Sequence, residues 1–339
     1  MTLYYQGNQT KQNLPIYLIV ILFLFIPDIS YAESSNRIHY VDDDNTTGPW
    51  DGSIEHPFRY IQDGIDAAQK MDTVIVYPGD YYENLKVSKQ IRLYGKEKNN
   101  TIIYASESKE FLLLDSVHYT VIGNFTFSCG NNERLDIIKM KNCTHCTISD
   151  VNIQSESIQR SALIVNGSIN TIERIHIKGR FIFSGIELFY TDQNLVINNT
   201  IESYGSGILL FRSHNNMILY NRILNNTNGI YLEEGNLNYI CGNILRNNNR
   251  GLFSSYATRN MIEKNDFVNN NEQAKFTKLL KTGFLLPNIW KFNYWDDLKG
   301  LLIKPIPGIF YIPNRFVIGL FIPWVEFDIC PVAEPFNNS

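Results

Sequence analysis

The chain has 339 residues, of which 44% are hydrophobic and 19% are charged, and its net charge is -4. Such a length and hydrophobic fraction are sufficient for one well-packed domain. The weak acidic balance predicts neither a nucleic-acid partner nor an anionic membrane surface as a partner.

The N-terminal segment 1–32 has the pattern of a cleavable signal peptide. Lys11 precedes an apolar run from Ile16 to Ile26, and Ser30-Tyr31-Ala32 supplies small residues at the positions that a signal peptidase recognises. The apolar run is shorter than the about 20 residues that span a bilayer. We expect a secreted or cell-surface protein without membrane contact after cleavage, with an uncleaved signal anchor as the alternative.

Residues 33–72 are predicted to form an N-terminal cap. Ile61, Ile65 and Ala68 fall on one face of a short helix, which would cover the open end of the first coil. Without a cover, the terminal coil would present unpaired strand edges that invite aggregation.

An acidic segment in this cap contains oxygen ligands that suit calcium. Asp42-Asp43-Asp44-Asn45 and Asp51 lie close together in the sequence. They lack the spacing of an EF-hand, and a solvated acidic turn is the interpretation that we favour.

The second half of the chain carries a 22-residue repeat. Two registers that hold over four repeats indicate a solenoid, and glycine and apolar residues keep the same spacing. The asparagine columns are Asn194, Asn216, Asn238 and Asn260, and, in parallel, Asn199, Asn221, Asn243 and Asn265. Apolar columns include Ile186, Ile208, Ile230 and Leu252, and the glycine column is Gly185, Gly207, Gly229 and Gly251.

The residue types select the kind of solenoid. Each repeat has short β-branched runs separated by turns of Asn, Gly and Ser, and no run has the apolar spacing of a long helix. The repeat also lacks the leucine-rich, ankyrin and tetratricopeptide patterns. We therefore predict an all-β, single-stranded parallel β-helix over residues 73–280, with coils of about 22–26 residues that stack about 4.8 Å apart. Residues 281–339 are predicted to form an irregular C-terminal cap.

The asparagine columns have a structural explanation. Asparagine tolerates the left-handed backbone of a tight bend, and stacked side-chain amides can hydrogen-bond from coil to coil. We expect these eight residues to form a structural ladder and not a binding site.

Three N-terminal segments and one C-terminal segment resemble a known group of proteins. They are His56 to Ala68, Asp72 to Glu83, Val87 to Gly95, and Asn293-Tyr294-Trp295-Asp296-Asp297. The chain resembles secreted right-handed parallel β-helix proteins of the pectin-lyase-like superfamily, in particular the NosD-type branch and its exported or surface proteins of archaea. The resemblance implies a right-handed β-helix from about Ile38 to Pro335. It does not imply one function, since the superfamily includes lyases, hydrolases, epimerases and adhesins.

One outward face of the predicted helix suits a sugar. Strand alternation places Ile186 and its column inside, so that the residues that follow them point outward. Aromatic rings beside carboxylates can stack on a sugar ring and bind its hydroxyls. The alternative is that the rings only pack along the ladder or lie under a loop. The candidate saccharide-binding residues are Glu187, Phe189, Phe211, Arg212, Tyr231, Glu233 and Phe253.

These residues do not favour catalysis. Glu187 and Glu233 are two coils apart and displaced along the strand, which gives about 12 Å between backbone positions, whereas catalytic carboxyl groups lie about 5 to 9.5 Å apart. Arg212 falls in register between Tyr190 and Glu234, where a surface ion pair worth under about 1 kcal/mol is expected.

A second candidate site contains soft metal ligands. Cys143, His145 and Cys146 lie close together in the sequence, and His118 precedes them by one coil. The NosD resemblance implies copper as the ion for this set. Two alternatives are that Cys146 is simply a small turn residue, and that Cys129 forms a disulfide with Cys143 or Cys146.

Together these patterns predict an exported or cell-surface protein that binds or supports saccharide without catalysis. A polysaccharide lyase or hydrolase is the main alternative, and a copper-handling protein is the second. Calcium and copper are the two ions that the sequence suggests, and a polysaccharide or surface glycan is the expected partner.

Overall fold

The computed structural model describes residues 36–104, 110–130, 135–203, 205–279, 286–298, 302–312 and 320–336. Asn36–Ser339 forms one compact unit. The predicted signal peptide lies outside the described residues. Within the described residues, no helix has both the length and the apolar character needed to span a membrane.

The strands stack into three parallel sheets, here named A, B and C. Sheet A contains β1 (Ile38–Val41), β2 (Thr73–Val76), β5 (Arg92–Gly95), β8 (Val121–Gly123), β11 (Thr147–Ser149), β13 (Thr171–Glu173), β15 (Leu195–Ile197), β18 (Met217–Leu219), β21 (Tyr239–Cys241), β24 (Met261–Glu263) and β27 (Ile289–Lys291). Sheet B contains β3 (Gly79–Tyr82), β6 (Thr101–Tyr104), β9 (Thr126–Cys129), β16 (Thr200–Ser203), β19 (Arg222–Leu224), β22 (Ile244–Arg246), β25 (Asp266–Val268) and β28 (Tyr294–Trp295). Sheet C contains β4 (Leu85–Val87), β7 (Leu112–Asp115), β10 (Ile138–Thr144), β17 (Ser206–Phe211), β20 (Asn228–Glu233), β23 (Arg250–Ser255), β26 (Glu272–Leu279) and β29 (Lys304–Ile312).

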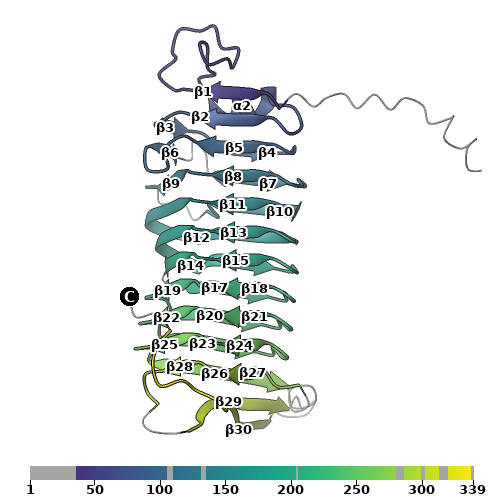
Figure 1. Cartoon of the computed structure of the whole chain (residues 1–339), viewed down its shortest axis with the longest axis vertical. Coiled ribbons are helices and arrows are strands. Elements are labelled where there is room, and N and C mark those ends of the chain that lie inside the picture. The colour runs from purple at the N-terminus through teal and green to yellow at the C-terminus, as the bar shows by residue number, and fades with distance from the viewer. Residues whose placement is uncertain are drawn as a thin grey trace, which may run out of the picture. The chain divides into compact units, whose positions relative to one another are not determined.

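Two long strands, β12 (Asn152–Ser168) and β14 (His176–Phe189), run through both sheet B and sheet C. Figure 1 shows β5 to β24 of sheet A lying one above the other. The helix α2 (Ile61–Ala67) packs against the first coil, with Ile61 and Ile65 fully buried, as the cap helix was predicted to do. These features confirm the right-handed parallel β-helix.

The core follows from the repeat. Ile208, Ile230 and Ile218 are each 0% exposed, and every coil places an equivalent residue against them. The glycine column is needed because a Cβ atom on Gly229 would lie 2.5 Å from the carbonyl oxygen of Gly251 in the next coil.

The asparagines form hydrogen-bonded columns inside the turns. The side-chain oxygen of Asn216 accepts hydrogen bonds from the backbone N–H and the side-chain amide of Asn194, at 2.9 and 3.1 Å, and this pattern repeats from coil to coil. A third column, which the sequence analysis missed, consists of Asn226, Asn248 and Asn270. The left-handed backbone does not belong to the ladder asparagines. It belongs to the residues just before them, such as Gln193 and Leu237.

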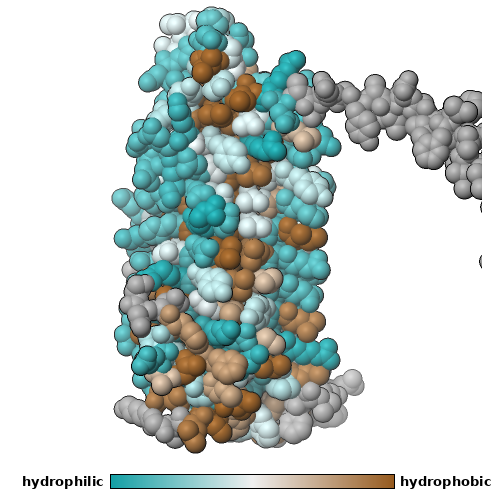
Figure 2. All heavy atoms as spheres, viewed as in Figure 1, coloured by the Kyte–Doolittle hydropathy of each residue, from teal (hydrophilic) through white to brown (hydrophobic). Residues whose placement is uncertain are grey.

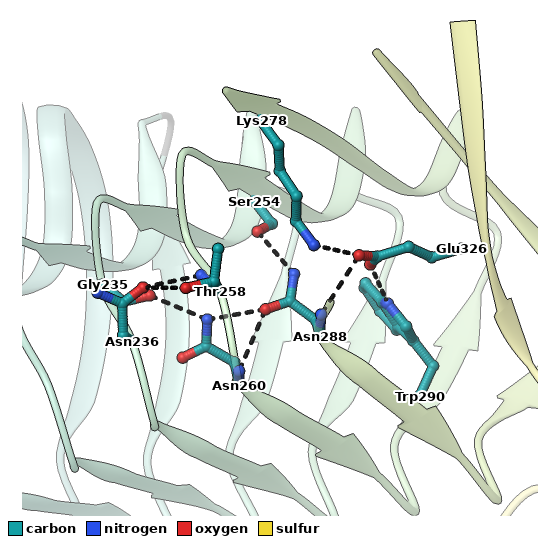
Figure 3. Close-up of polar contacts among 9 residues, drawn as sticks. All are labelled: Gly235, Asn236, Ser254, Thr258, Asn260, Lys278, Asn288, Trp290 and Glu326. Carbon is teal, nitrogen blue, oxygen red and sulfur yellow. Dashed lines mark hydrogen bonds and ion pairs between the residues drawn. The ribbon is translucent and has the colours of Figure 1, made fainter. Parts of the chain in front are cut away.

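The bonds between asparagines have a direction, because each asparagine donates its backbone N–H and its side-chain amide to the asparagine of the next coil, although the amide also donates to a carbonyl oxygen of the preceding coil. The last asparagine of a column therefore needs an acceptor outside the repeat. β30 (Leu320–Asp328), which pairs antiparallel with β29, supplies two buried carboxylates. Glu326 accepts from Asn288, from Trp290 and from the buried Lys278 (Figure 3), and Asp328 accepts from Asn293.

At both ends of the β-helix, the number of residues in a coil departs from the predicted 22–26. Thr73 pairs with Arg92, which gives a shorter coil, and Arg92 pairs with Val121, which gives a longer one. Asn260 and Asn288 are 28 residues apart. Figure 2 shows apolar side chains gathered toward the C-terminal end, where Phe321 and Phe327 of β30 are exposed.

Candidate functional site

The outward columns of sheet C have the predicted register. Glu187 pairs with Leu209, and Leu209 with Tyr231, while Phe189 pairs with Phe211. The rings of Phe189 and Phe211 stack with centroids 5.4 Å apart. Tyr231 and Phe253 stack at 5.1 Å, and both are half-buried, not covered. Sheet C therefore carries two stacked aromatic pairs on its outer surface.

Arg212 links three coils beside the first aromatic pair. Its guanidinium donates to the carboxylate of Glu234 at 2.8 Å and to the hydroxyl of Tyr190 at 2.8 Å, and it lies 5.3 Å from the ring centre of Phe211. The side chains of Arg212 and Glu234 are about half exposed, at 45% and 42%. The ion pair on which the sequence analysis relied is thus present, and it holds the guanidinium against the aromatic surface.

A hollow of about 540 Å³ lies on sheet C beside Phe189. It is bounded by β10, β12 and β14. The register of β12 against β14 breaks twice, between Ser155 and Ile158 and between Gln159 and Ser161. Extra residues at these breaks carry Arg160 and Phe183 outward to form one wall, with the guanidinium of Arg160 5.6 Å from the ring centre of Phe183.

Two carboxyl groups meet at one serine in this hollow. The Ser161 hydroxyl donates to Oε2 of Glu187 at 3.0 Å, and the Ser161 backbone N–H donates to Oδ1 of Asp136 at 3.3 Å. The Ser184 hydroxyl adds a 3.5 Å contact to Glu187, and Arg160 lies 3.5 Å from Asp136.

The pKa of each carboxyl group lies above its ordinary value. Burial raises the pKa of Glu187, and the nearby charge of Asp136 raises it further. Burial also raises the pKa of Asp136, although Arg160 and Lys139 act in the opposite direction. A carboxyl group whose ionised form is penalised in a pocket is typical of a functional site.

The predicted saccharide residues therefore separate into groups along sheet C. Glu187 and Phe189 line the hollow, whereas Glu233 lies two coils from Glu187 and outside it. The sequence analysis missed Asp136 and Arg160, because they lie in coils where the 22-residue spacing fails.

A second hollow, of about 760 Å³, is lined by residues of β12, β14 and β16. Its walls include Glu156, Lys178, Arg180 and Glu202. Phe183 and the other exposed aromatic residues of sheet C are not among the residues that line it. The hollow beside Glu187 is therefore the better candidate for a sugar ring.

The four predicted copper ligands do not converge. Cys143 and Cys146 are buried, and a hydrogen bond between their thiols raises the pKa of Cys143 and lowers that of Cys146. His145 instead lies on the surface and stacks on Tyr119, and His118 bonds through Nδ1 to a threonine hydroxyl. The turn after β10 explains the difference: β10 ends at Thr144, and His145 has a left-handed backbone that leaves its imidazole outside, whereas Cys143 and Cys146 on either side of it are buried.

The part of the chain that the structure describes holds no group of three or more His, Cys, Asp or Glu side chains able to bind a metal ion. The predicted copper set therefore does not fit a site of three or four ligands. The structure does not form the alternative disulfide from Cys129 to Cys143 or Cys146. In the acidic N-terminal segment, Asp42, Asp43 and Asp51 each accept a backbone N–H, which agrees with the acidic turn and not with a calcium site.

The model of the family described as "Periplasmic copper-binding protein (NosD)" matches residues 66–300. A search of curated protein sequences found no match.

Solved structures of the same fold include three proteins that are named as saccharide-active enzymes. An exopolygalacturonase from Thermotoga maritima has a TM-score of 0.56 at 11% identity, covering 85% of this chain and 95% of that chain. A GH136 lacto-N-biosidase from Eubacterium ramulus has a TM-score of 0.53 at 11% identity, covering 77% of this chain and 60% of that chain. The A-module of a mannuronan C-5 epimerase from Azotobacter vinelandii has a TM-score of 0.50 at 14% identity, covering 69% and 81%. At these identities the likeness shows the fold alone.

Proposed function

The chain belongs to the NosD family, and we propose that it is an exported protein whose hollow beside Glu187 binds a saccharide. The observation that carries this proposal is the combination, in one hollow, of exposed aromatic rings with a buried and a half-buried carboxyl group. Phe183 is 50% exposed and Phe189 is 37% exposed, while Asp136 and Glu187 line the same hollow and share Ser161 as a hydrogen-bond partner.

The hollow has the size and the groups that a sugar needs. About 540 Å³ falls within the range of small-molecule sites, which is about 300 to 1,000 Å³. A sugar can place the C–H face of its ring against an aromatic ring, and its hydroxyls can bind the carboxyl groups and Arg160. The ring of Phe211, which stacks on Phe189, and the stacked pair of Tyr231 and Phe253 extend the surface for further sugar units along the coils.

Export is supported by two independent features. The family description is that of a periplasmic protein, and the N-terminal 32 residues have the composition of a signal peptide. An exported protein with this fold meets polysaccharides outside the cytoplasm. The saccharide-active enzymes that share this fold support such a ligand class.

The test is a glycan array followed by calorimetry on the positive ligands. Because the ligand is unidentified, the probes are oligosaccharides of galacturonan, mannuronan and α-1,3-glucan together with lacto-N-tetraose. Phe183→Ala and Phe189→Ala should each weaken binding about 5- to 30-fold, which corresponds to a stacking contact of about 1 to 2 kcal/mol.

Tyr119→Ala is the matched control, since Tyr119 is an exposed aromatic residue, 57% accessible, that stacks on His145 away from the hollow. It should leave the affinity unchanged. If none of the probes binds the parent protein, or if Tyr119→Ala weakens binding as much as Phe183→Ala does, the proposal is wrong.

A further inference from the structure

Asp136 and Glu187 are joined through a single residue. Oδ1 of Asp136 accepts the Ser161 backbone N–H at 3.3 Å, and Oε2 of Glu187 accepts the Ser161 hydroxyl at 3.0 Å. Because both oxygens contact the same residue, they are at most about 10 Å apart. Two carboxyl groups can act on one glycosidic bond when they are about 5 to 9.5 Å apart, and this separation falls within the limit. The pair that the sequence analysis considered, Glu187 and Glu233, has no such link.

The two carboxyl groups have different surroundings. Asp136 faces the guanidinium of Arg160 at 3.5 Å, and Lys139 lies in the wall of the same hollow. These cations favour the ionised form of Asp136. Glu187 instead accepts hydrogen bonds from the hydroxyl groups of Ser161 and Ser184, and it lies beside the negative charge of Asp136. Asp136, with a cation in direct contact, therefore suits the role of the proton acceptor, which leaves Glu187 as the proton donor.

The stability of the fold does not explain why a carboxyl group is present at either position. Burial raises the pKa of both groups, so their ionised forms cost folding free energy at neutral pH. An apolar or amide side chain at either position would avoid this cost. Their shared position in the wall of an accessible hollow, which the rings of Phe183 and Phe189 also line, instead suits a proton donor and a proton acceptor.

On the basis of the proposed saccharide binding, we infer that this hollow hydrolyses a glycosidic bond, with Glu187 as the general acid and Asp136 as the general base. Glu187 donates its proton to the glycosidic oxygen as the bond from that oxygen to the anomeric carbon breaks. A water oxygen bonds to the same carbon, and the water proton passes to Asp136. Proton exchange with solvent then restores both groups. Ser161 and Ser184 are positioning residues that orient Glu187.

The experiment incubates the full-length protein with each oligosaccharide that it binds, in water enriched in ¹⁸O. Hydrolysis should give shorter oligosaccharides in which mass spectrometry finds one ¹⁸O atom at the new reducing end. Glu187→Gln and Asp136→Asn should keep the affinity within a few-fold and slow cleavage at least about 100-fold. The control Asp150→Asn alters a surface carboxylate that does not line the hollow, and it should cleave like the parent.

The pH profile separates a proton-transfer role from a structural one. The parent should have a bell-shaped dependence of kcat/KM on pH, and Glu187→Gln should lose the limb on the alkaline side. Ser161→Ala should shift this limb without abolishing binding, since it removes a hydrogen bond to Glu187.

The outcomes distinguish this inference from the proposed binding. Binding without cleavage overturns hydrolysis and leaves the saccharide proposal intact, whereas the absence of any bound probe overturns both. Unsaturated products without ¹⁸O would identify a lyase and contradict the inference. Cleavage that persists in both Glu187→Gln and Asp136→Asn would also contradict it.

Discussion

Asn293 ends the second asparagine column and donates both its backbone N–H and its side-chain amide to one carboxylate oxygen of Asp328, at 3.0 and 2.9 Å. The same oxygen accepts the indole N–H of Trp295 at 3.1 Å, and Asp328 is 0% exposed. Since each asparagine of the column donates to the asparagine of the next coil, the donors left at the end of the column point at this carboxylate. β30 thus acts as an electrostatic cap on the repeat.

The first prediction concerns this cap. Asp328→Ala leaves three buried N–H donors without an acceptor, and we expect it to lower the free energy of unfolding by at least about 3 kcal/mol. Asp328→Asn keeps an acceptor oxygen and should cost less. Denaturation in guanidinium chloride measures both, with the half-exposed Asp150→Asn as the surface control. If Asp328→Ala unfolds at the same denaturant concentration as the parent, the cap does not stabilise the repeat.

A second prediction concerns the interior of the ladder. Asn216→Ala removes an acceptor for Asn194 and donors to Asn238 and to a carbonyl oxygen. We expect a loss of about 1 to 3 kcal/mol in unfolding free energy, with unchanged saccharide affinity. The neighbouring Met217→Ala is the control, because Met217 is 42% exposed. Unchanged stability together with lost binding would make the ladder part of a site.

The third prediction follows from the raised pKa of Glu187. A carboxyl group with a raised pKa in the folded state stabilises the fold below its ordinary value of about 4.3, and this contribution is lost as the pH rises through the folded-state pKa. At pH 7 the ionised Glu187 therefore costs stability. Glu187→Gln should raise the Tm at pH 7, and the difference from the parent should shrink toward pH 4.

Asp150 provides the opposite case for this measurement. Its hydrogen bonds with Arg174 lower the pKa of Asp150, so its contribution is present above the ordinary value of an aspartate and is lost as the pH falls through the lowered pKa. Asp150→Asn should therefore lower the Tm at pH 7 or leave it unchanged. A lower Tm for Glu187→Gln at pH 7 would show that Glu187 contributes to stability and would weaken its assignment as a functional group.

The fold could be predicted because one physical constraint repeats. Each coil must bury the same positions and turn at the same positions, so the 22-residue spacing of Ile208, Ile230 and their equivalents is visible in the sequence. The third asparagine column, Asn226, Asn248 and Asn270, has the same spacing and could have been found by the same comparison. Glu326 and Asp328 could not, since they lie on an antiparallel strand that follows no repeat.

The site was harder to predict because it lies where the repeat changes. Asp136, Arg160 and Phe183 belong to coils with extra residues, and the bulges in β12 break the columns that connect them to Glu187. The copper set failed for a related reason. Spacing in the sequence brought Cys143 and His145 together, but the left-handed turn at His145, just beyond the end of β10, leaves the imidazole outside while the thiol is buried.

The last prediction tests how far the binding surface extends beyond the hollow. Tyr231 is half-buried and stacks on Phe253 at 5.1 Å, one coil from Leu209 and two coils from Glu187. Tyr231→Ala should weaken a long oligosaccharide about 5- to 30-fold in calorimetry and leave the affinity for a disaccharide unchanged. The Tm should stay near that of the parent, whereas Ile230→Asp, one residue away in the core, should lose several kcal/mol. Equal losses for long and short ligands would place Tyr231 within the primary site, and no loss for either would confine the binding surface to the hollow beside Glu187.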